Sequence, residues 1–372
     1  MRNTQDLITQ FDIAHPRPWR SLRWLVLRGT SVLLAGIVTA GCAGKKPDNS
    51  HKLRIGFCLE SLRHERWHRD LDAFTARAQE LGAVVLAQSA DGNDALQVRQ
   101  AENLLTQGVD VLVVVPHNGL VASSIVENAK RQKVPVIAYD RMIRDSDVDF
   151  YISFDNVKVG QQQAEYLLTR APRGNYVLIG GAPSDENARL LREGQMRVLQ
   201  PAVDRHEIRI VADQWAKDWL PSEALRHTEN ALTQARNSVV AVVASNDSTA
   251  GGVVQALQEQ RLAGKVLVSG QDAELAACRR IAEGTQAMTV YKPSVALATK
   301  AAEIAVTLAK HQVVAASTTV NNGFKDVPAL LLDSIVIDQN NLASIVSKER
   351  FLTLDAVYRN VPREQWPRTK GN

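Results

Sequence analysis

Polar and aromatic side chains recur just beyond apolar segments that have the length of buried strands. They are Arg66 and Trp67 after residues 53–59, Asp140 and Arg141 after 134–139, Trp215 after 208–212, Asn246 after 239–244, Asp272 after 266–269, and Lys292 after 287–291. In open α/β sheets, ligands bind at the carboxyl ends of the strands. These side chains are therefore candidate ligand contacts.

The residue types in this set suit a ligand that carries many hydroxyl groups. Each hydroxyl can donate and accept a hydrogen bond, so carboxylates accept from it, arginine and lysine donate to it, and asparagine does both. Charge-assisted bonds are the stronger kind. The apolar C–H faces of a pyranose can pack on the amphipathic ring of tryptophan. The set predicts a monosaccharide site, with one tryptophan from each of two domains.

Each residue also has an ordinary structural explanation. An aspartate after a strand is commonly the N-cap of the next helix, and Asp247 and Asp272 both precede predicted helices. Asp140 and Arg141 can form a surface ion pair. Trp67 stands at a core-like position of a helix. It is the recurrence of such residues after successive strands that favours a binding site.

The elements that must position these side chains alternate between strand and helix. Strands are expected at residues 53–59, 83–87, 109–115, 134–139, 176–179, 208–212, 239–244, 266–269 and 287–291, with helices between them. The strand segments are uniformly apolar, as is typical of strands covered on both faces. This alternation predicts doubly wound parallel sheets of the Rossmann-like α/β class. The rhythm restarts after residues 154–156, which predicts two such domains.

Charge and cysteine content exclude several classes of protein. Of the net charge of +4 in 372 residues, five arginines against two aspartates in residues 1–41 account for +3. The nearly neutral remainder argues against a nucleic-acid partner. Cys42, Cys58 and Cys278 show no metal-binding spacing, and no cofactor or metal is expected.

The N-terminal segment has the pattern of an export signal. Residues 29–40 are apolar and uncharged, too short to span a bilayer but suited to the core of a signal peptide. They lead to Gly41-Cys42, and small residues before a cysteine resemble the lipobox of bacterial lipoproteins. We therefore expect a signal peptide in residues 1–41, a lipid anchor at Cys42, a tether in residues 42–51, and an extracytoplasmic location. The alternative is an ordinary cleaved signal peptide with a chance cysteine, since Thr39 stands where leucine is commonest.

Several segments resemble those of the D-xylose-binding group within the ribose-binding-protein-like family of type I periplasmic binding proteins. They are Arg63-His64-Glu65-Arg66-Trp67, Tyr139-Asp140-Arg141-Met142-Ile143, residues 150–156, Asp213-Gln214-Trp215, Ala244-Ser245-Asn246-Asp247, Ser269-Gly270-Gln271-Asp272, residues 289–293, and Asn321-Asn322-Gly323 with residues 325–328. These segments occur together and in order between residue 53 and about residue 340.

The resemblance implies two α/β domains joined by a three-strand hinge, with the sugar bound in the cleft between them. It implies an N-terminal lobe of residues 52–154 and 293–325, a C-terminal lobe of residues 155–292 and 326–345, and a tail of residues 346–372. It implies ligand contacts from Arg66, Trp67, Asp140, Arg141, Asn187, Arg189, Trp215, Asn246, Asp272 and Lys292. The register near Asn187 is open by a residue or two.

The resemblance further implies a monomeric binding protein that captures a monosaccharide, D-xylose in the first place, by hinge closure and delivers it to an ABC permease in the membrane. The alternatives are another pentose or hexose, or a receptor subunit that reports the sugar to a chemoreceptor or histidine kinase. Glu60 and His64 depart from the family pattern, which has Asp and Leu there. The segment after residue 345 matches poorly.

Two further classes are disfavoured by the sequence. An enzyme on a similar fold would need catalytic motifs, and GxSxG, HExxH, GxGxxG and GxxxxGK[ST] are all missing from the sequence. A sugar-responsive repressor would begin with a helix-turn-helix, where this chain has an export signal. We therefore expect a binding protein without enzymatic activity.

Overall fold

The computed structural model describes residues 52–367, so the signal peptide, the tether and the lipid anchor at Cys42 lie outside the described residues. A first lobe is built from residues 54–154 and 294–332. Its elements are β1 (Arg54–Leu59), α1 (Glu65–Glu80), β2 (Val84–Ser89), α2 (Asp94–Thr106), β3 (Val111–Val114), α3 (Ser123–Arg131), β4 (Val136–Tyr139), β5 (Phe150–Phe154), α9 (Ser294–Ala309), β11 (Thr318–Asn321) and β12 (Asp326–Leu332).

The sheet of the first lobe is almost entirely parallel. Its strand order is β11-β12-β5-β4-β3-β1-β2, and only the edge strand β11 runs antiparallel to its neighbour. Helices cover both faces, because the strands are apolar on both sides. On one face α1 and α9 pack on Phe57, Val113 and Tyr139, and on the other α2 and α3 pack on Cys58 and Leu112. Residues 55–59 of β1 are thus buried, whereas Leu53 and Arg54 are partly exposed.

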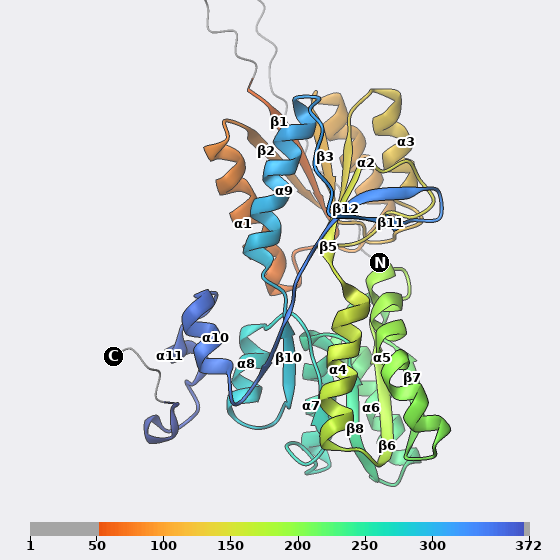
Figure 1. Ribbon diagram of the computed structural model, residues 1–372, viewed down its shortest axis with the longest axis vertical. Helices are drawn as coiled ribbons and strands as arrows, with labels where there is room; N and C mark the ends of the chain where they lie inside the picture. Colours follow the sequence, from red (N-terminus) through yellow and green to blue (C-terminus); the bar gives the residue numbers. More distant parts are fainter. Residues whose placement is uncertain (1–51, 368–372) are drawn as a thin grey trace, which may run out of the picture. The chain divides into compact units, whose positions relative to one another are not determined.

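A second lobe repeats this plan (Figure 1). Its elements are α4 (Asn156–Arg170), β6 (Gly174–Gly180), α5 (Glu186–Asp204), β7 (Ile208–Trp215), η1 (Lys217–Trp219), α6 (Pro221–Gln234), β8 (Val239–Ala244), α7 (Asp247–Glu259), β9 (Leu267–Val268), α8 (Leu275–Ala282), β10 (Met288–Tyr291), β13 (Ile335–Asp338), α10 (Leu342–Glu349), α11 (Leu354–Val357) and η2 (Arg363–Gln365). Strands β7-β6-β8-β9 form a parallel sheet, and β10 pairs with β13. The predicted class, two doubly wound α/β domains of the type I binding-protein fold, is confirmed.

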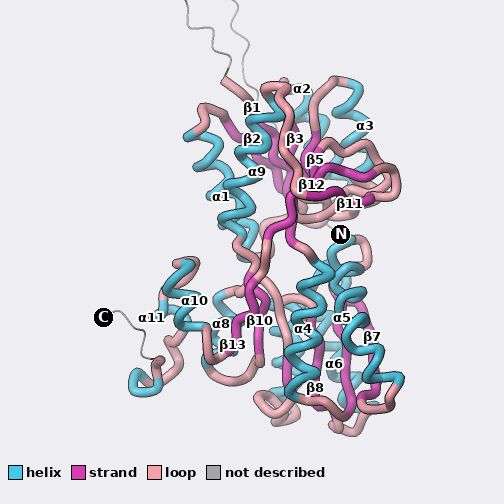
Figure 2. Tube along the Cα trace, viewed as in Figure 1, coloured by secondary structure: helices cyan, strands magenta, loops and turns pink. Residues whose placement is uncertain are grey.

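Three segments cross between the lobes, as Figure 2 shows in the trace. One joins β5 to α4, one joins β10 to α9 through Lys292 and Pro293, and one joins β12 to β13. Strand β12 pairs with β5 in the first sheet, with Ala329 opposite Tyr151. Residues 326–332, which we expected in the second lobe, therefore lie in the first, and the third crossing comes only after Leu332. This apolar strand finds its partner in β5.

The C-terminal segment packs against the second lobe. Helices α10 and α11 join the apolar cluster around α8, and the ring of Phe351 stacks on Tyr291 with 4.3 Å between centroids. The apolar side chains after residue 345 thus cover the β10–β13 pair. Within residues 52–367, no helix combines the length and the apolar character required to cross a bilayer.

Candidate functional site

A cavity lies between the carboxyl ends of the strands of the two lobes. About 330 Å³ of space, part of it open to solvent, lies among its side chains. The lining consists of His64, Arg66, Trp67, Asp140, Arg141, Asp185, Asn187, Trp219, Asn246, Gln271, Asp272 and Lys292.

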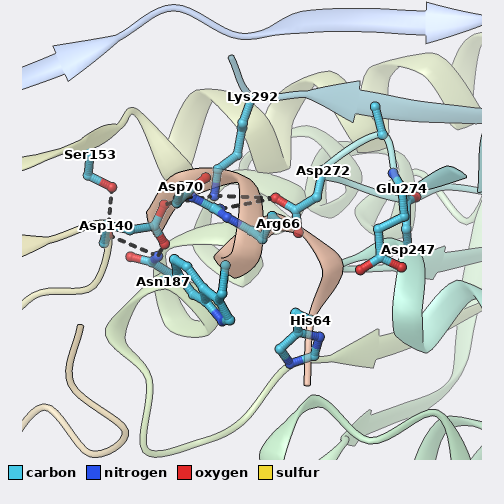
Figure 3. Close-up of polar contacts among 12 residues, drawn as sticks. His64, Arg66, Asp70, Asp140, Ser153, Asn187, Asp247, Asp272, Glu274 and Lys292 are labelled. Atoms are coloured by element: carbon cyan, nitrogen blue, oxygen red, sulfur yellow. Dashed lines mark hydrogen bonds and ion pairs between the residues drawn. The ribbon is translucent and has the colours of Figure 1, made fainter. Parts of the chain in front are cut away.

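The guanidinium of Arg66 holds the centre of this cavity (Figure 3). Its Nη2 donates to Asp140 at 2.7 Å and to Asp70 at 3.1 Å, while Nη1 donates to Asp272 of the second lobe at 3.2 Å. Lys292 Nζ lies 3.5 Å from Asp140 and 3.8 Å from Asp272. All five side chains are almost completely buried. We call these five residues the Arg66 centre.

The Arg66 centre keeps Asp140 ionised although burial alone would favour the neutral acid. Burial raises the pKa of Asp140, but the charges of Arg66, Lys292 and Arg141 outweigh it and lower the pKa to about 2. A carboxylate in this state accepts hydrogen bonds and donates none. Asp140 is therefore a permanent acceptor at the cavity wall.

The backbone of Asp140 is held in an uncommon conformation. Its φ of 60° lies in the left-handed region, which non-glycine residues seldom adopt. Its carbonyl accepts from the hydroxyls of Tyr151 at 3.2 Å and Ser153 at 2.6 Å and from Asn187 Nδ2 at 3.1 Å. Such conformations persist where surrounding contacts enforce them. Here these contacts turn the carboxylate of Asp140 into the cavity.

Trp67 presents a ring flanked by cations. Its Nε1 donates to Glu60 Oε1 at 3.0 Å, which fixes the indole in the wall of the cavity. The guanidinium carbons of Arg66 and Arg141 lie 4.4 Å and 5.7 Å from the ring centroid. Arg141 also keeps the pKa of Glu60 below its usual range, against the burial that would raise it. Glu60, which departs from the family pattern, thus accepts a hydrogen bond from Trp67 and forms an ion pair with Arg141.

The second lobe contributes residues from the starts of its helices. Asp185 is the N-cap of α5 and accepts from the backbone N–H of Asn187 at 3.0 Å. Its other oxygen accepts from Trp219 Nε1 at 3.1 Å and lies 2.8 Å from Arg141 Nε of the first lobe. Asn246 is the N-cap of α7 and forms a capping box with Thr249. Capping and lining the cavity are therefore compatible roles for these side chains.

Most of the residues named from the sequence meet at this cavity. Those that line it are Arg66, Trp67, Asp140, Arg141, Asn187, Asn246, Asp272 and Lys292. Whether they contact a ligand stays a prediction.

Trp215 and Arg189 lie elsewhere. Strand β7 continues to Trp215, three residues beyond its expected end, and the indole packs over Gly180, where an added Cβ would lie 2.6 Å from the ring. Arg189 is exposed and pairs with Glu186 and Glu193 on the outer face of α5. The structure thus corrects the placement of both side chains. Trp215 still belongs to β7, because the strand is longer than we expected. Arg189 lies on a face of α5 that points away from the cavity.

Four lining residues were not among the expected contacts: His64, Asp185, Trp219 and Gln271. Trp219, rather than Trp215, lines the cavity. Its ring packs against Gly181, where an added Cβ would lie 2.2 Å from the ring. His64 and Gln271 belong to the segments HERW and GQD that carry the resemblance, so the sequence did contain a signal for them. The signal for Asp185 was its place as a helix cap.

Two polar atoms of lining residues lack a hydrogen-bond partner. Within residues 52–367, Arg66 Nε and Gln271 Oε1 are buried and have no such partner, and unpaired buried polar atoms are costly. The same part of the chain contains no group of three or more His, Cys, Asp or Glu side chains that could hold a metal ion.

Comparison with known proteins gives consistent matches. Residues 55–312 match the family model described as periplasmic binding protein domain. The D-xylose-binding periplasmic protein of Escherichia coli K12 is 52% identical over 322 residues, covering 87% of this chain and 95% of the relative. The corresponding protein of Haemophilus influenzae is 51% identical, covering 83% and 93%. A crystal structure of a carbohydrate transporter solute binding protein from Chloroflexus aurantiacus, in complex with D-glucose, superposes with a TM-score of 0.78 at 31% identity and covers 82% of this chain and 98% of that one.

Proposed function

Since the chain belongs to the periplasmic binding protein family, we propose that it binds a monosaccharide, D-xylose in the first place, in the cavity between its lobes and delivers it to an ABC permease. The observation that carries the proposal is the lining itself. Carboxyl groups, guanidinium groups, an ammonium group and amides surround one small space, with Trp67 and Trp219 from opposite lobes at its walls.

The lining charges favour a neutral polyhydroxylated ligand over an anion. Asp140, Asp185 and Asp272 offset the cations of Arg66, Arg141 and Lys292 at short range. A sugar hydroxyl can accept from a cation and donate to a neighbouring carboxylate at the same time. A phosphate or carboxylate on the ligand would instead meet these aspartates.

D-Xylose is preferred because the two relatives described above, at 52% and 51% identity, are named for D-xylose binding. We assign the contacts to Arg66, Trp67, Asp140, Arg141, Asn187, Asn246, Asp272 and Lys292. Trp219 takes the place that we expected for Trp215, and Arg189 is left out.

Capture by closure is supported by contacts that join the lobes at the cavity. Arg66 donates to Asp272, Arg141 pairs with Asp185, and Asn187 donates to Asp140 at 3.1 Å. Each pair has one partner in each lobe, so opening about the three crossings breaks all of them. A sugar that contacts both lobes stabilises the closed form, because it gains those contacts only there. The closed form is the one we expect the permease to accept.

We also propose that the protein is exported and held at a membrane through a lipidated Cys42. The small residues before this cysteine and the periplasmic relatives support the assignment. Replacement Cys42→Ala in the producing bacterium should move the protein from the membrane fraction to the soluble extracytoplasmic fraction. If the fractionation is unchanged, the lipid anchor is refuted, and the alternative of an ordinary cleaved signal peptide remains.

The binding proposal is tested by titrating the purified protein with D-xylose, D-ribose, L-arabinose and D-glucose, following tryptophan fluorescence and heat. We expect saturable binding, tightest for D-xylose, that is lost in Asp272→Ala. The fluorescence change should fall strongly in Trp219→Phe and persist in the matched variant Trp215→Phe, whose ring lies outside the cavity. Tightest binding of another sugar would replace D-xylose as ligand, and no binding of any of the four would refute the sugar assignment.

A further inference from the structure

A histidine outside the cavity bridges the two lobes between two carboxylates. His117 follows β3 in the first lobe, and its Nδ1 lies 2.6 Å from Asp94 Oδ1 at the start of α2. Its Nε2 lies 3.3 Å from Asp218 Oδ1, which belongs to η1 of the second lobe. The imidazole retains 13% of its exposure, so it remains within reach of solvent protons. His117 is not among the residues that line the cavity.

The surrounding backbone makes this bridge part of the lobe interface. The N–H of His117 donates to Gln97 Oε1 at 3.0 Å, which ties the segment to α2. Its carbonyl accepts from Ser184 Oγ of the second lobe at 3.3 Å, and the N–H of Gly119 donates to the Ser184 carbonyl at 3.1 Å. His117 therefore comes to Asp218 only when these backbone contacts between the lobes are also made.

We propose that closure around the sugar is coupled to protonation of His117, whose imidazolium then joins Asp94 to Asp218 as a latch. The inference deepens the proposed capture of a sugar by closure and rests on it. It concerns the closing equilibrium rather than the sugar contacts.

The number of donors on the ring decides the coupling. A neutral imidazole has one N–H and can donate to only one of the two carboxylates, so the lone pair of its other nitrogen faces the second. The imidazolium donates from both nitrogens, and both bonds are then charge-assisted. In the open form Asp218 leaves with the second lobe, and the ring keeps only Asp94. The closed form therefore favours the protonated ring more strongly than the open form does.

One cation nearby works against the two carboxylates. A Cβ added to Gly92 would lie 2.6 Å from Arg63 Nη2 and 3.6 Å from His117 Nε2, which places that guanidinium near the ring. Arg63, Asp94 and Asp218 are the charged groups that face the imidazole from the β1–α1 segment, α2 and η1. The two carboxylates lie in direct contact with the ring, whereas the guanidinium makes no hydrogen bond to it.

The direction and size of the effect follow from ordinary histidine chemistry. Lowering the pH from 8 to 6 supplies protons, and the latch requires one on the imidazole. A partly exposed ion pair is worth a modest free energy. We therefore expect sugar affinity to rise about three- to tenfold between pH 8 and pH 6.

The test is calorimetric titration with D-xylose at pH 6, 7 and 8, each in two buffers of different ionisation enthalpy. The wild type should take up part of a proton on binding, and His117→Gln should take up clearly less and lose most of its pH dependence. Asp218→Asn removes the second carboxylate at a left-handed position that asparagine tolerates, and should act in the same direction. The matched control His311→Gln replaces an exposed histidine just after the C-terminal end of α9 and should behave as the wild type.

His64 and Glu274, which also lie near the lobe interface, are present in every variant, so the difference between wild type and His117→Gln isolates the latch. Equal proton uptake and equal pH dependence in these two proteins would overturn the inference while leaving sugar capture intact. If no sugar binds, the proposed function fails, and the latch is tested by X-ray scattering of the sugar-free protein. A wild type more compact at pH 6 than at pH 8, with no such change in His117→Gln, is then the expected result, and identical pH responses would overturn it.

Discussion

Asp140 of the first lobe and Glu274 of the second lobe lie on the two sides of the cavity, and both side chains are more than nine-tenths buried. Figure 3 shows them on either side of Arg66 and Asp272. Their surroundings differ in the number of cations. Asp140 belongs to the Arg66 centre, whereas Glu274 lies beside Asp247 in what we call the acidic cluster (Asp247 and Glu274).

The acidic cluster has few positive partners. Burial, followed by the charge of Asp272, raises the pKa of Glu274 to about 7, and Ser248 and Arg280 only partly offset this. Burial and the neighbouring Glu274 raise the pKa of Asp247 well above its usual range. Asp140 thus stays ionised beside Arg66 and Lys292, whereas burial with few cations raises the pKa of both carboxyl groups of the acidic cluster.

The two regions also differ in what their carboxyl groups hold in place. Asp140 lines the cavity, where it is the ionised acceptor that our proposal assigns to a sugar hydroxyl. Asp247 instead accepts from the N–H of Glu274 at 3.0 Å, from Thr289 Oγ1 at 2.9 Å and from Gln286 Nε2 at 2.9 Å. It thereby fixes the turn that carries Asp272. Cations therefore surround the carboxylate that lines the cavity, whereas hydrogen-bond donors surround the carboxyl group of Asp247 behind it.

Removing the central cation should have the largest effect. Arg66→Met leaves Asp70, Asp140 and Asp272 without their shared partner, and breaking a buried ion pair costs about 3–5 kcal/mol of unfolding free energy. Loss of a buried charge at a binding site should also weaken D-xylose binding by about a hundredfold or more. Chemical unfolding and calorimetric titration measure the two effects.

The matched control for this change is Arg197→Met, which removes an exposed arginine paired with Glu193 on α5. It should alter unfolding by less than about 1 kcal/mol and leave binding unchanged. Similar losses in both variants would mean that the Arg66 centre is no more important than a surface pair.

Glu274→Gln should stabilise the protein at high pH. The folded-state pKa of Glu274 is raised to about 7 from 4.5, so its contribution to stability is present below about pH 4.5 and is lost as the pH rises through 7. Glutamine carries no proton to lose, so between pH 5 and pH 8 the variant should gain about 3 kcal/mol relative to the wild type. Exposed Glu229→Gln should show no such gain, and parallel pH curves for wild type and Glu274→Gln would contradict the prediction.

Asp140→Asn should show the opposite pH response, and a smaller one. The folded-state pKa of Asp140 is lowered to about 2, so its stabilising effect is present above the unfolded pKa near 4 and is lost as the pH falls through 2. The deficit of the variant relative to the wild type should shrink by about 2 kcal/mol between pH 5 and pH 2. Acid unfolding of both proteins, with exposed Asp72→Asn as control, measures this, and a constant deficit would rule it out.

Much of this architecture was predictable because its signals are local. The apolar runs at residues 134–139 and 239–244 are β4 and β8 to within two residues, and their polar successors Asp140 and Asn246 line the cavity. Strands buried on both faces require apolar residues at every position, and this leaves a clear pattern in the chain. Element ends were less predictable, as β7 shows by continuing to Trp215.

The sequence by itself determined the alternation of strand and helix, the division into two lobes, and the polar residues at the strand ends, since each depends on neighbours in the chain. The tertiary structure decided which tryptophan of the second lobe faces the cavity, the place of β12 beside β5, and the three carboxylates around Arg66. It also decided that Asp140 stays ionised while burial raises the pKa of Glu274. The physical reason is that pairing, burial and ionisation depend on side chains up to about two hundred positions apart, such as Arg66 and Asp272, which only the fold brings within 3.2 Å.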